Sequence, residues 1–225
     1  MDIAKPGKVS DDILQQVKHL RLMDDVLMVK CFENDSRCAE LLLRLIFKKS
    51  ALQVSRVKPM WHGPSVGLAI LAANKGWRYQ IRVFRDDTAD RDRKNGLELY
   101  SAEYAAAMAG IDQNVSAHFV IYIVEHGVTR KPIDKGGILL DGWSEQGYCG
   151  FGTSAFYVNC DRKNRSPLGK LMYDFSCTDP SYMNYPQLAD RVRYFKEDMQ
   201  GILALREMLE EKRKRAQNYE APKVN

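Results

Sequence analysis

Features that would define a function directly are missing from this 225-residue sequence. No apolar run approaches the length needed to span a bilayer, and residues 1–12 contain no apolar signal region. Internal repeats and low-complexity tracts are absent as well. We therefore expect a cytoplasmic protein with no membrane partner.

The cysteine and histidine residues lack the spacing of metal sites. The five cysteines are odd in number and include no CxxC pair, and the four histidines show no ligand spacing. Cys31 and Cys38 lie seven residues apart in a helical pattern, which places both on one buried face. We expect reduced structural thiols in preference to a zinc site or a set of disulfides.

What is present fits one ordinary to large domain with a hydrophobic core, since 45% of residues are hydrophobic and 28% are charged. The formal net charge of +5 permits a nucleic-acid partner without demanding one.

The stretch from Ser65 to Asp87 predicts a β-hairpin, around which we expect the chain to be organised. Apolar residues alternate on both sides of Asn74-Lys75-Gly76, and this tripeptide tolerates the positive φ that a tight turn needs. The alternating positions are Val66, Leu68 and Ile70 before the turn, and Tyr79, Ile81 and Val83 after it.

Patterns elsewhere predict a series of helices and strands. Helices are expected at 10–20, 22–32, 37–47 (capped by Asn34-Asp35-Ser36), 97–108, 166–175, 187–196 and 199–217. Strands are expected at 53–59 (an edge strand ending at Pro59), 117–124, 138–140, 148–151 and 155–158. This order predicts an α/β or α+β domain with a mixed central sheet flanked by helices.

The charged run Glu210–Arg215 has two readings. It is able to bind phosphate, but a solvated helix end, with cations at the C-terminus of the helix, accounts for it more simply. We favour the solvated helix end.

Several short segments resemble one known family. Residues 24–28 read Asp-Asp-Val-Leu-Met, residues 33–35 Glu-Asn-Asp, residues 38–42 Cys-Ala-Glu-Leu-Leu, residues 119–124 form an apolar strand, and residues 156–159 read Phe-Tyr-Val-Asn. In this order and spacing they resemble the PD-(D/E)XK nuclease family transposases, relatives of the recombination-promoting nucleases.

The resemblance runs from about residue 22 to residue 196 and implies a PD-(D/E)XK restriction-endonuclease-like core with extra C-terminal strands and helices. We accordingly expect a leader and short helix in 1–21, the core in 22–126, further strands and helices of the same domain in 127–196, and a charged helix and tail in 197–225.

The resemblance also implies a chemistry that this sequence contradicts. In the family, two carboxylates on adjacent central strands hold Mg²⁺, which activates water against a phosphodiester, and a glutamine helps to orient the nucleophile. The corresponding positions here are Ala69, Arg82 and Phe84, and Glu40 is the retained acidic residue.

Alanine has no ligand atom, and arginine repels a cation. We therefore expect no catalytic residue, no metal site and no cofactor. An active Mg²⁺-dependent nuclease would require migrated carboxylates, for which the neighbouring acidic residues are Asp86, Asp87, Asp90, Asp92, Glu98 and Glu103.

Two binding hypotheses follow. In the first, Lys75, Arg78, Arg82 and Arg85 contact the phosphates of DNA or RNA directly. On the alternative reading of Arg82, it pairs with Glu40 or a nearby aspartate and merely stabilises the fold. In the second, the protein is a mobile-element or phage inhibitor or adaptor, for example against a host defence complex, with a partner surface at Trp143, Tyr148 and Phe151.

Overall fold

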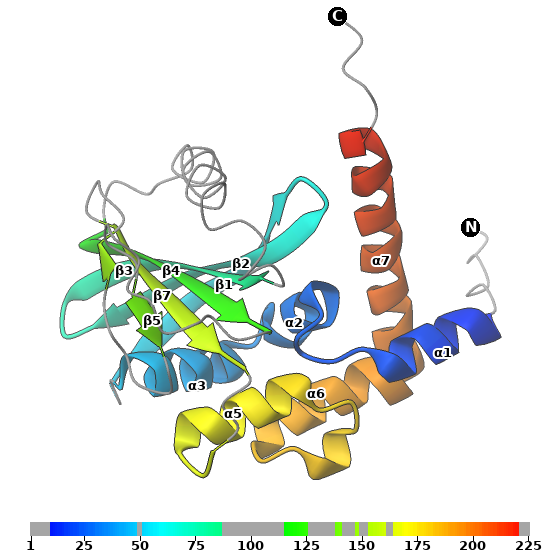
Figure 1. Cartoon of the computed structure of the whole chain (residues 1–225), viewed down its shortest axis with the longest axis horizontal. Coiled ribbons are helices and arrows are strands. Elements are labelled where there is room, and N and C mark those ends of the chain that lie inside the picture. The colour runs from blue at the N-terminus through cyan, green and yellow to red at the C-terminus, as the bar shows by residue number, and fades with distance from the viewer. Residues whose placement is uncertain are drawn as a thin grey trace, which may run out of the picture.

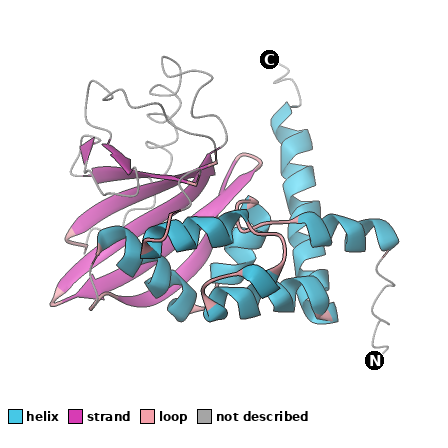
Figure 2. Ribbon diagram, turned by 60° about the horizontal axis from the view of Figure 1, so that its bottom comes forward, coloured by secondary structure: helices cyan, strands magenta, loops and turns pink. Residues whose placement is uncertain are grey.

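The computed structural model describes residues 10–48, 51–86, 115–125, 138–140, 147–148, 153–160 and 164–220. A mixed sheet forms one layer, and the helices pack mainly against one of its faces (Figures 1 and 2). The predicted α+β class with a mixed sheet and flanking helices is confirmed at this coarse level. The predicted helix at 97–108 lies outside the described residues.

The N-terminal helices begin close to where the sequence predicts. They are α1 (Asp11–His19), α2 (Asp25–Phe32) and α3 (Ser36–Phe47). Asp35 caps α3, because its carboxylate accepts hydrogen bonds from the backbone N–H of Arg37 at 3.0 Å and of Cys38 at 3.3 Å.

The strands form one sheet in the order β1-β2-β3-β4-β7-β5, with β6 paired to β7. The neighbours β1/β2, β2/β3 and β6/β7 are antiparallel, whereas β3/β4, β4/β7 and β5/β7 are parallel. The strands are β1 (Gln53–His62), β2 (Ser65–Asn74), β3 (Trp77–Asp86), β4 (Ala117–Val124), β5 (Ile138–Leu140), β6 (Gly147–Tyr148) and β7 (Thr153–Asn159).

The predicted hairpin is confirmed as β2 and β3. Asn74 pairs with Trp77, so the connection is the two-residue turn Lys75-Gly76, with φ of 46° and 85°. Positive φ at both central residues is the type I′ geometry that matches the twist of a hairpin. Glycine and lysine at these positions therefore set the pairing register of the two longest central strands.

The sheet has one core face and one opposite face. Alternate residues of β2 and β3 are buried against the helices, as the cross-strand pairs Leu68↔Val83 and Ile70↔Ile81 illustrate. All four of these side chains are fully buried. The intervening residues therefore project to the opposite face.

The prediction that the first strand ends at Pro59 is wrong, because β1 continues to His62 and Pro59 pairs with Leu68. Within the described residues β1 lies at the edge of the sheet, and a residue without an N–H is tolerated in an edge strand.

The C-terminal helices are α5 (Pro167–Ser176), α6 (Pro186–Glu197) and α7 (Met199–Glu220), with the 3₁₀ turn η1 (Pro180–Tyr182). Asp174 is fully buried and anchors the connection between α5 and α6. Its carboxylate accepts hydrogen bonds from the N–H groups of Asn184 at 2.7 Å and Tyr185 at 2.9 Å. Within the described ranges, no helix is both long enough and apolar enough to cross a membrane.

The reading of Glu210–Arg215 as a solvated helix end holds in part, since Glu210, Arg213 and Lys214 are exposed, but other residues of the run make tertiary contacts. The helix α7 extends beyond this run to Glu220, and Lys212 forms an ion pair at 2.5 Å with the buried carboxylate of Asp25 on α2. Arg215 lies over the ring of Trp61 at 4.7 Å, and Arg213 donates to Gln16 on α1. The run fastens α7 to α1, α2 and β1.

The expectation of structural thiols fits the structure, in which Cys31 and Cys38 are both free and fully buried. Burial raises the pKa of the Cys38 thiol to about 12 and also raises the pKa of Cys31. Both thiols therefore stay protonated at neutral pH, which makes them unreactive packing groups.

Substitution Lys212→Ala is expected to lower the free energy of unfolding by about 2 kcal/mol, because it leaves the buried Asp25 carboxylate without its counter-ion. The neighbouring exposed lysine supplies the control, and Lys214→Ala should change stability by less than about 0.5 kcal/mol. Urea unfolding measures both. Equal effects of the two substitutions would show that the ion pair does not hold α7 in place.

Candidate functional site

The two positions that the resemblance assigns to metal-binding carboxylates lie opposite one another in the sheet. Ala69 on β2 pairs directly with Arg82 on β3. Directly paired residues in antiparallel strands project from the same face, and here it is the face opposite the helices. Two carboxylates placed at these positions would have been neighbours able to share a metal ion.

Cations flank Ala69 on both sides of this row. Lys58 on β1 also pairs with Ala69, so Lys58, Ala69 and Arg82 are consecutive cross-strand neighbours. Lys58 is exposed, whereas only 5% of Arg82 is exposed. A phosphate arriving from solvent therefore has far more access to Lys58 than to Arg82.

An aromatic side chain occupies the position that the resemblance gives to the nucleophile-orienting glutamine. Phe84 stacks against Tyr122 of β4, with ring centroids 6.0 Å apart and planes 23° apart. The ring also lies close to Gly67 on β2, where an added Cβ would come within 2.6 Å of Phe84 Cδ1. The phenylalanine side chain at this position packs against its neighbours and offers no group that activates water.

The retained acidic residue, Glu40, has a structural role. Its carboxylate accepts a hydrogen bond from the backbone N–H of Val54 at 3.0 Å and pairs with Arg44 at 2.9 Å. Glu40 belongs to α3 on the helical side, whereas Arg82 projects from the opposite face of the sheet. This placement disfavours the Arg82–Glu40 pair considered above.

The acidic residues considered as migrated ligands lie almost wholly beyond the described ranges. Asp86 is the last residue of β3, and its backbone pairs with Val124. Asp87, Asp90, Asp92, Glu98 and Glu103 fall in residues that the structure does not describe. Within the described ranges, no group of three or more His, Cys, Asp or Glu residues is placed to hold a metal ion.

The structure separates the four candidate phosphate-binding cations. Lys75 and Arg78 are exposed at the turn end of the hairpin. Arg85 lies near the other end of β3, where its guanidinium pairs with Glu125 at 3.3 Å. Of the four predicted cations, only Lys75 and Arg78 are therefore both exposed and close together in the chain.

Glu125 joins two arginines into a bridge between the sheet and the segment that precedes α2. Its carboxylate pairs with Arg21 at 2.7 Å as well as with Arg85. Burial alone would raise the pKa of Glu125, but the two guanidinium groups outweigh it and lower the pKa below its ordinary value. Arg85 is thus engaged in holding the fold.

Sequence reasoning missed two further exposed cations of β1, Arg56 and Lys58. Arg56 pairs with Leu71 as Lys58 pairs with Ala69, which places both on the face that carries Arg82. The signal was available, since residues 53–86 contain six lysines and arginines and a single acidic residue, Asp86. The first three strands thus hold a concentrated positive charge.

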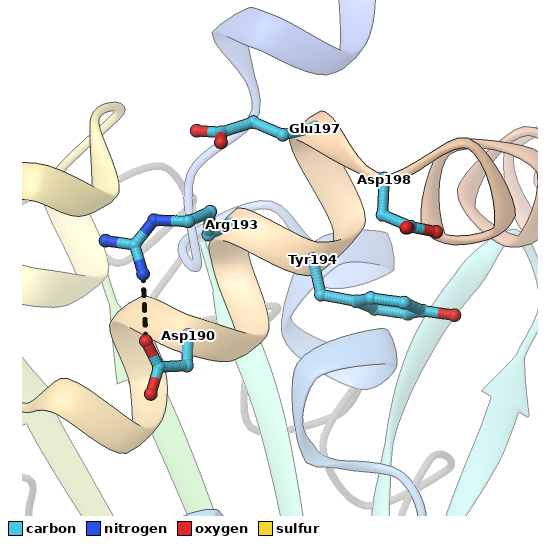
Figure 3. Close-up of a pocket in the computed structure, with 5 residues that line it drawn as sticks. All are labelled: Asp190, Arg193, Tyr194, Glu197 and Asp198. Carbon is cyan, nitrogen blue, oxygen red and sulfur yellow. Dashed lines mark hydrogen bonds and ion pairs between the residues drawn. The ribbon is translucent and has the colours of Figure 1, made fainter.

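A shallow surface hollow of about 430 Å³ lies elsewhere, along α6. Figure 3 shows its lining, in which Arg193 and Asp190 are joined by an ion pair of 2.8 Å. Both side chains are largely exposed, and the hollow holds no buried polar group that would select a ligand. The residues that line it are Asp190, Arg193, Tyr194, Glu197 and Asp198.

The side chains of the aromatic residues predicted as a partner surface lie outside the described part of the structure. Trp143 and Phe151 lie outside the described residues, and Tyr148 is described only as a backbone position of β6. The partner surface therefore stays a prediction.

Comparisons with protein-family models, with curated proteins and with solved structures found no match. The function is therefore inferred from the geometry of the face of β2 and β3 that carries Ala69 and Arg82.

Substitution Glu125→Gln is expected to destabilise the protein by about 1 kcal/mol at pH 7, because it breaks both arginine pairs. A carboxyl whose folded-state pKa is lowered stabilises above its unfolded pKa, ordinarily 4.5, and loses this contribution as the pH falls through the folded value. The difference from the wild type should therefore be largest above pH 4.5 and should shrink as the pH falls further, through the lowered folded-state pKa. Thermal unfolding across this range measures it, and a constant difference would contradict the assignment.

Proposed function

We propose that this protein is a catalytically silent PD-(D/E)XK-like protein that acts by binding nucleic acid and not by cleaving it. One observation carries the proposal. The two positions expected to hold metal-binding carboxylates are paired in register on one face of β2 and β3, and they are Ala69 and Arg82. On this proposal, the pair marks the place of a two-carboxylate site, and neither residue offers a metal ligand.

Charge at this position argues against a metal ion. A divalent cation next to Ala69 would meet the ammonium of Lys58 on one side and the guanidinium of Arg82 on the other. The buried guanidinium of Arg82 repels the ion by several kcal/mol at short range in a medium of low effective dielectric, whereas solvent screens the repulsion from the exposed ammonium of Lys58. Lys58, which is exposed, attracts the phosphates that a metal ion would otherwise have bridged.

The distribution of charge favours nucleic acid over a protein partner. The net charge of the whole chain is +5, and residues 53–86, which form β1 to β3 and their turns, carry six cations against one acidic residue. Lys58, Arg56, Lys75 and Arg78 are all exposed on these strands. A basic surface concentrated on one part of the fold is the electrostatic footprint of a phosphate-backbone contact.

No cleavage is expected when the purified protein is incubated with supercoiled plasmid and Mg²⁺ or Mn²⁺, because the paired positions offer the metal no ligand. Gel electrophoresis of the plasmid measures nicking. The variant Asp86→Ala/Asp87→Ala is the control for migrated ligands. Metal-dependent cleavage by the wild type that this variant abolishes would overturn the proposal in favour of an active nuclease.

The affinity for DNA or RNA is expected to fall steeply with salt, and Lys75→Ala/Arg78→Ala should make the log–log slope shallower by about 1.4 for a single strand. The matched control is Arg165→Ala/Lys170→Ala, which removes one exposed arginine and one exposed lysine at the start of α5 in the helical layer (Figure 1). This control should leave the slope unchanged.

Fluorescence anisotropy over a salt series measures both variants. Absence of any affinity at low ionic strength would remove the nucleic-acid function and leave the inhibitor or adaptor role, which a pull-down from the native host tests.

A further inference from the structure

One exposed aromatic residue accompanies the cations at the turn end of the hairpin. Trp77, the first residue of β3, has 58% of its surface exposed. Among the described residues with large exposed apolar side chains, Trp77 is the one in the sheet, since the others lie in the helical layer. An exposed indole costs hydrophobic free energy, which binding to an apolar surface would recover.

The turn presents Trp77 in a defined orientation. Trp77 pairs with Asn74 across the two-residue turn, so its backbone is held by the hairpin ladder. It shares the side of the strand on which Tyr79 and Ile81 project, but it is not covered by the helices as they are. A Cβ added at Gly76 would meet nothing within 4 Å, which shows that the turn beside Trp77 is open.

Cations adjoin Trp77 on both sides in the sequence. Lys75 lies in the turn two residues before Trp77, and Arg78 follows it directly, projecting from the other face of the strand. An aromatic platform with adjoining cations is the arrangement that binds a base and the phosphates next to it, because the indole stacks on the base and the cations neutralise the backbone.

We propose that the hairpin tip Lys75–Arg78 binds single-stranded nucleic acid, with Trp77 stacking on an unpaired base while Lys75 and Arg78 contact the adjoining phosphates. This inference rests on the proposed nucleic-acid function and specifies its ligand. A duplex keeps its bases stacked on one another, so it offers the indole no base face without unstacking. Every base has such a face, and the contact therefore tolerates any sequence.

The exposed side chains described in the hairpin favour single-stranded nucleic acid over a lipid surface as the ligand. Membrane anchoring scales with the apolar area that is buried, and Trp77 is the single large exposed apolar side chain described in β2 and β3. The exposed cations also continue away from the tip along β1, at Arg56 and Lys58, on the face from which Arg78 projects, as a track for an extended polyanion that passes around the tip.

Fluorescence anisotropy with a labelled oligothymidylate and a labelled duplex of equal length tests the inference. Trp77→Ala is expected to weaken oligothymidylate binding roughly tenfold without changing the salt slope, while duplex binding changes little. Trp77→Phe should restore most of the affinity, because phenylalanine also stacks. Circular dichroism of both variants verifies folding.

Each outcome decides one of the two proposals. If Trp77→Ala binds oligothymidylate as the wild type does while Lys75→Ala/Arg78→Ala still weakens binding, stacking at Trp77 is wrong and the proposed function stands. If the wild type binds neither probe at low salt, both the stacking at Trp77 and the proposed nucleic-acid function are wrong. Sedimentation with phosphatidylserine vesicles that depends on Trp77, without oligothymidylate binding, would identify a lipid surface instead.

Discussion

The pairing register of β2 and β3 is the constraint on which the rest of the structure depends. The turn Lys75-Gly76 has positive φ at both residues, which fixes Asn74 opposite Trp77 and, five pairs further along, Ala69 opposite Arg82. A slip of one residue would turn Leu68, Ile70 and their neighbours out of the core and bring the basic positions into it. The same register thus buries the apolar face and assembles the basic one.

The layer of helices stabilises the arrangement in which one face of the sheet is apolar and the other is basic. It covers the apolar face of the sheet. Its last helix, α7, is held in place by residues that are distant from it in the sequence. Asp25 connects three elements, because its carboxylate pairs with Lys212 of α7 and accepts a hydrogen bond from Val66 N–H of β2, while Asp25 itself belongs to α2. A buried carboxylate with this set of partners is costly to disturb.

Local patterns were sufficient for most of the described elements. The alternation on either side of Lys75-Gly76 predicted the hairpin, and the Asp35 cap predicted the start of α3 to within one residue. Such features depend on a few consecutive residues whose backbone preferences act without help from the rest of the chain.

What the sequence did not predict depends on contacts between distant residues. Lys212 and Asp25 are 187 positions apart, and nothing near either residue signals that they meet. The sequence predicted an edge strand ending at Pro59, but that β1 continues to His62 depends on its pairing with β2, where Pro59 lies opposite Leu68. In the candidate site, the sequence shows that positions 69 and 82 are alanine and arginine. That these two residues pair, that Arg82 is buried and that Trp77 is exposed can be seen only in the folded structure.

The central proposal is that the paired positions Ala69 and Arg82 hold no metal ion and that exposed cations of the hairpin contact phosphate directly. Diffraction from crystals grown with oligothymidylate and Mn²⁺, with anomalous data collected for manganese, tests it most directly. The account predicts ordered phosphates against the exposed cations of the hairpin and no manganese peak beside Ala69 and Arg82. A manganese ion bridging protein and phosphate at that pair would contradict it.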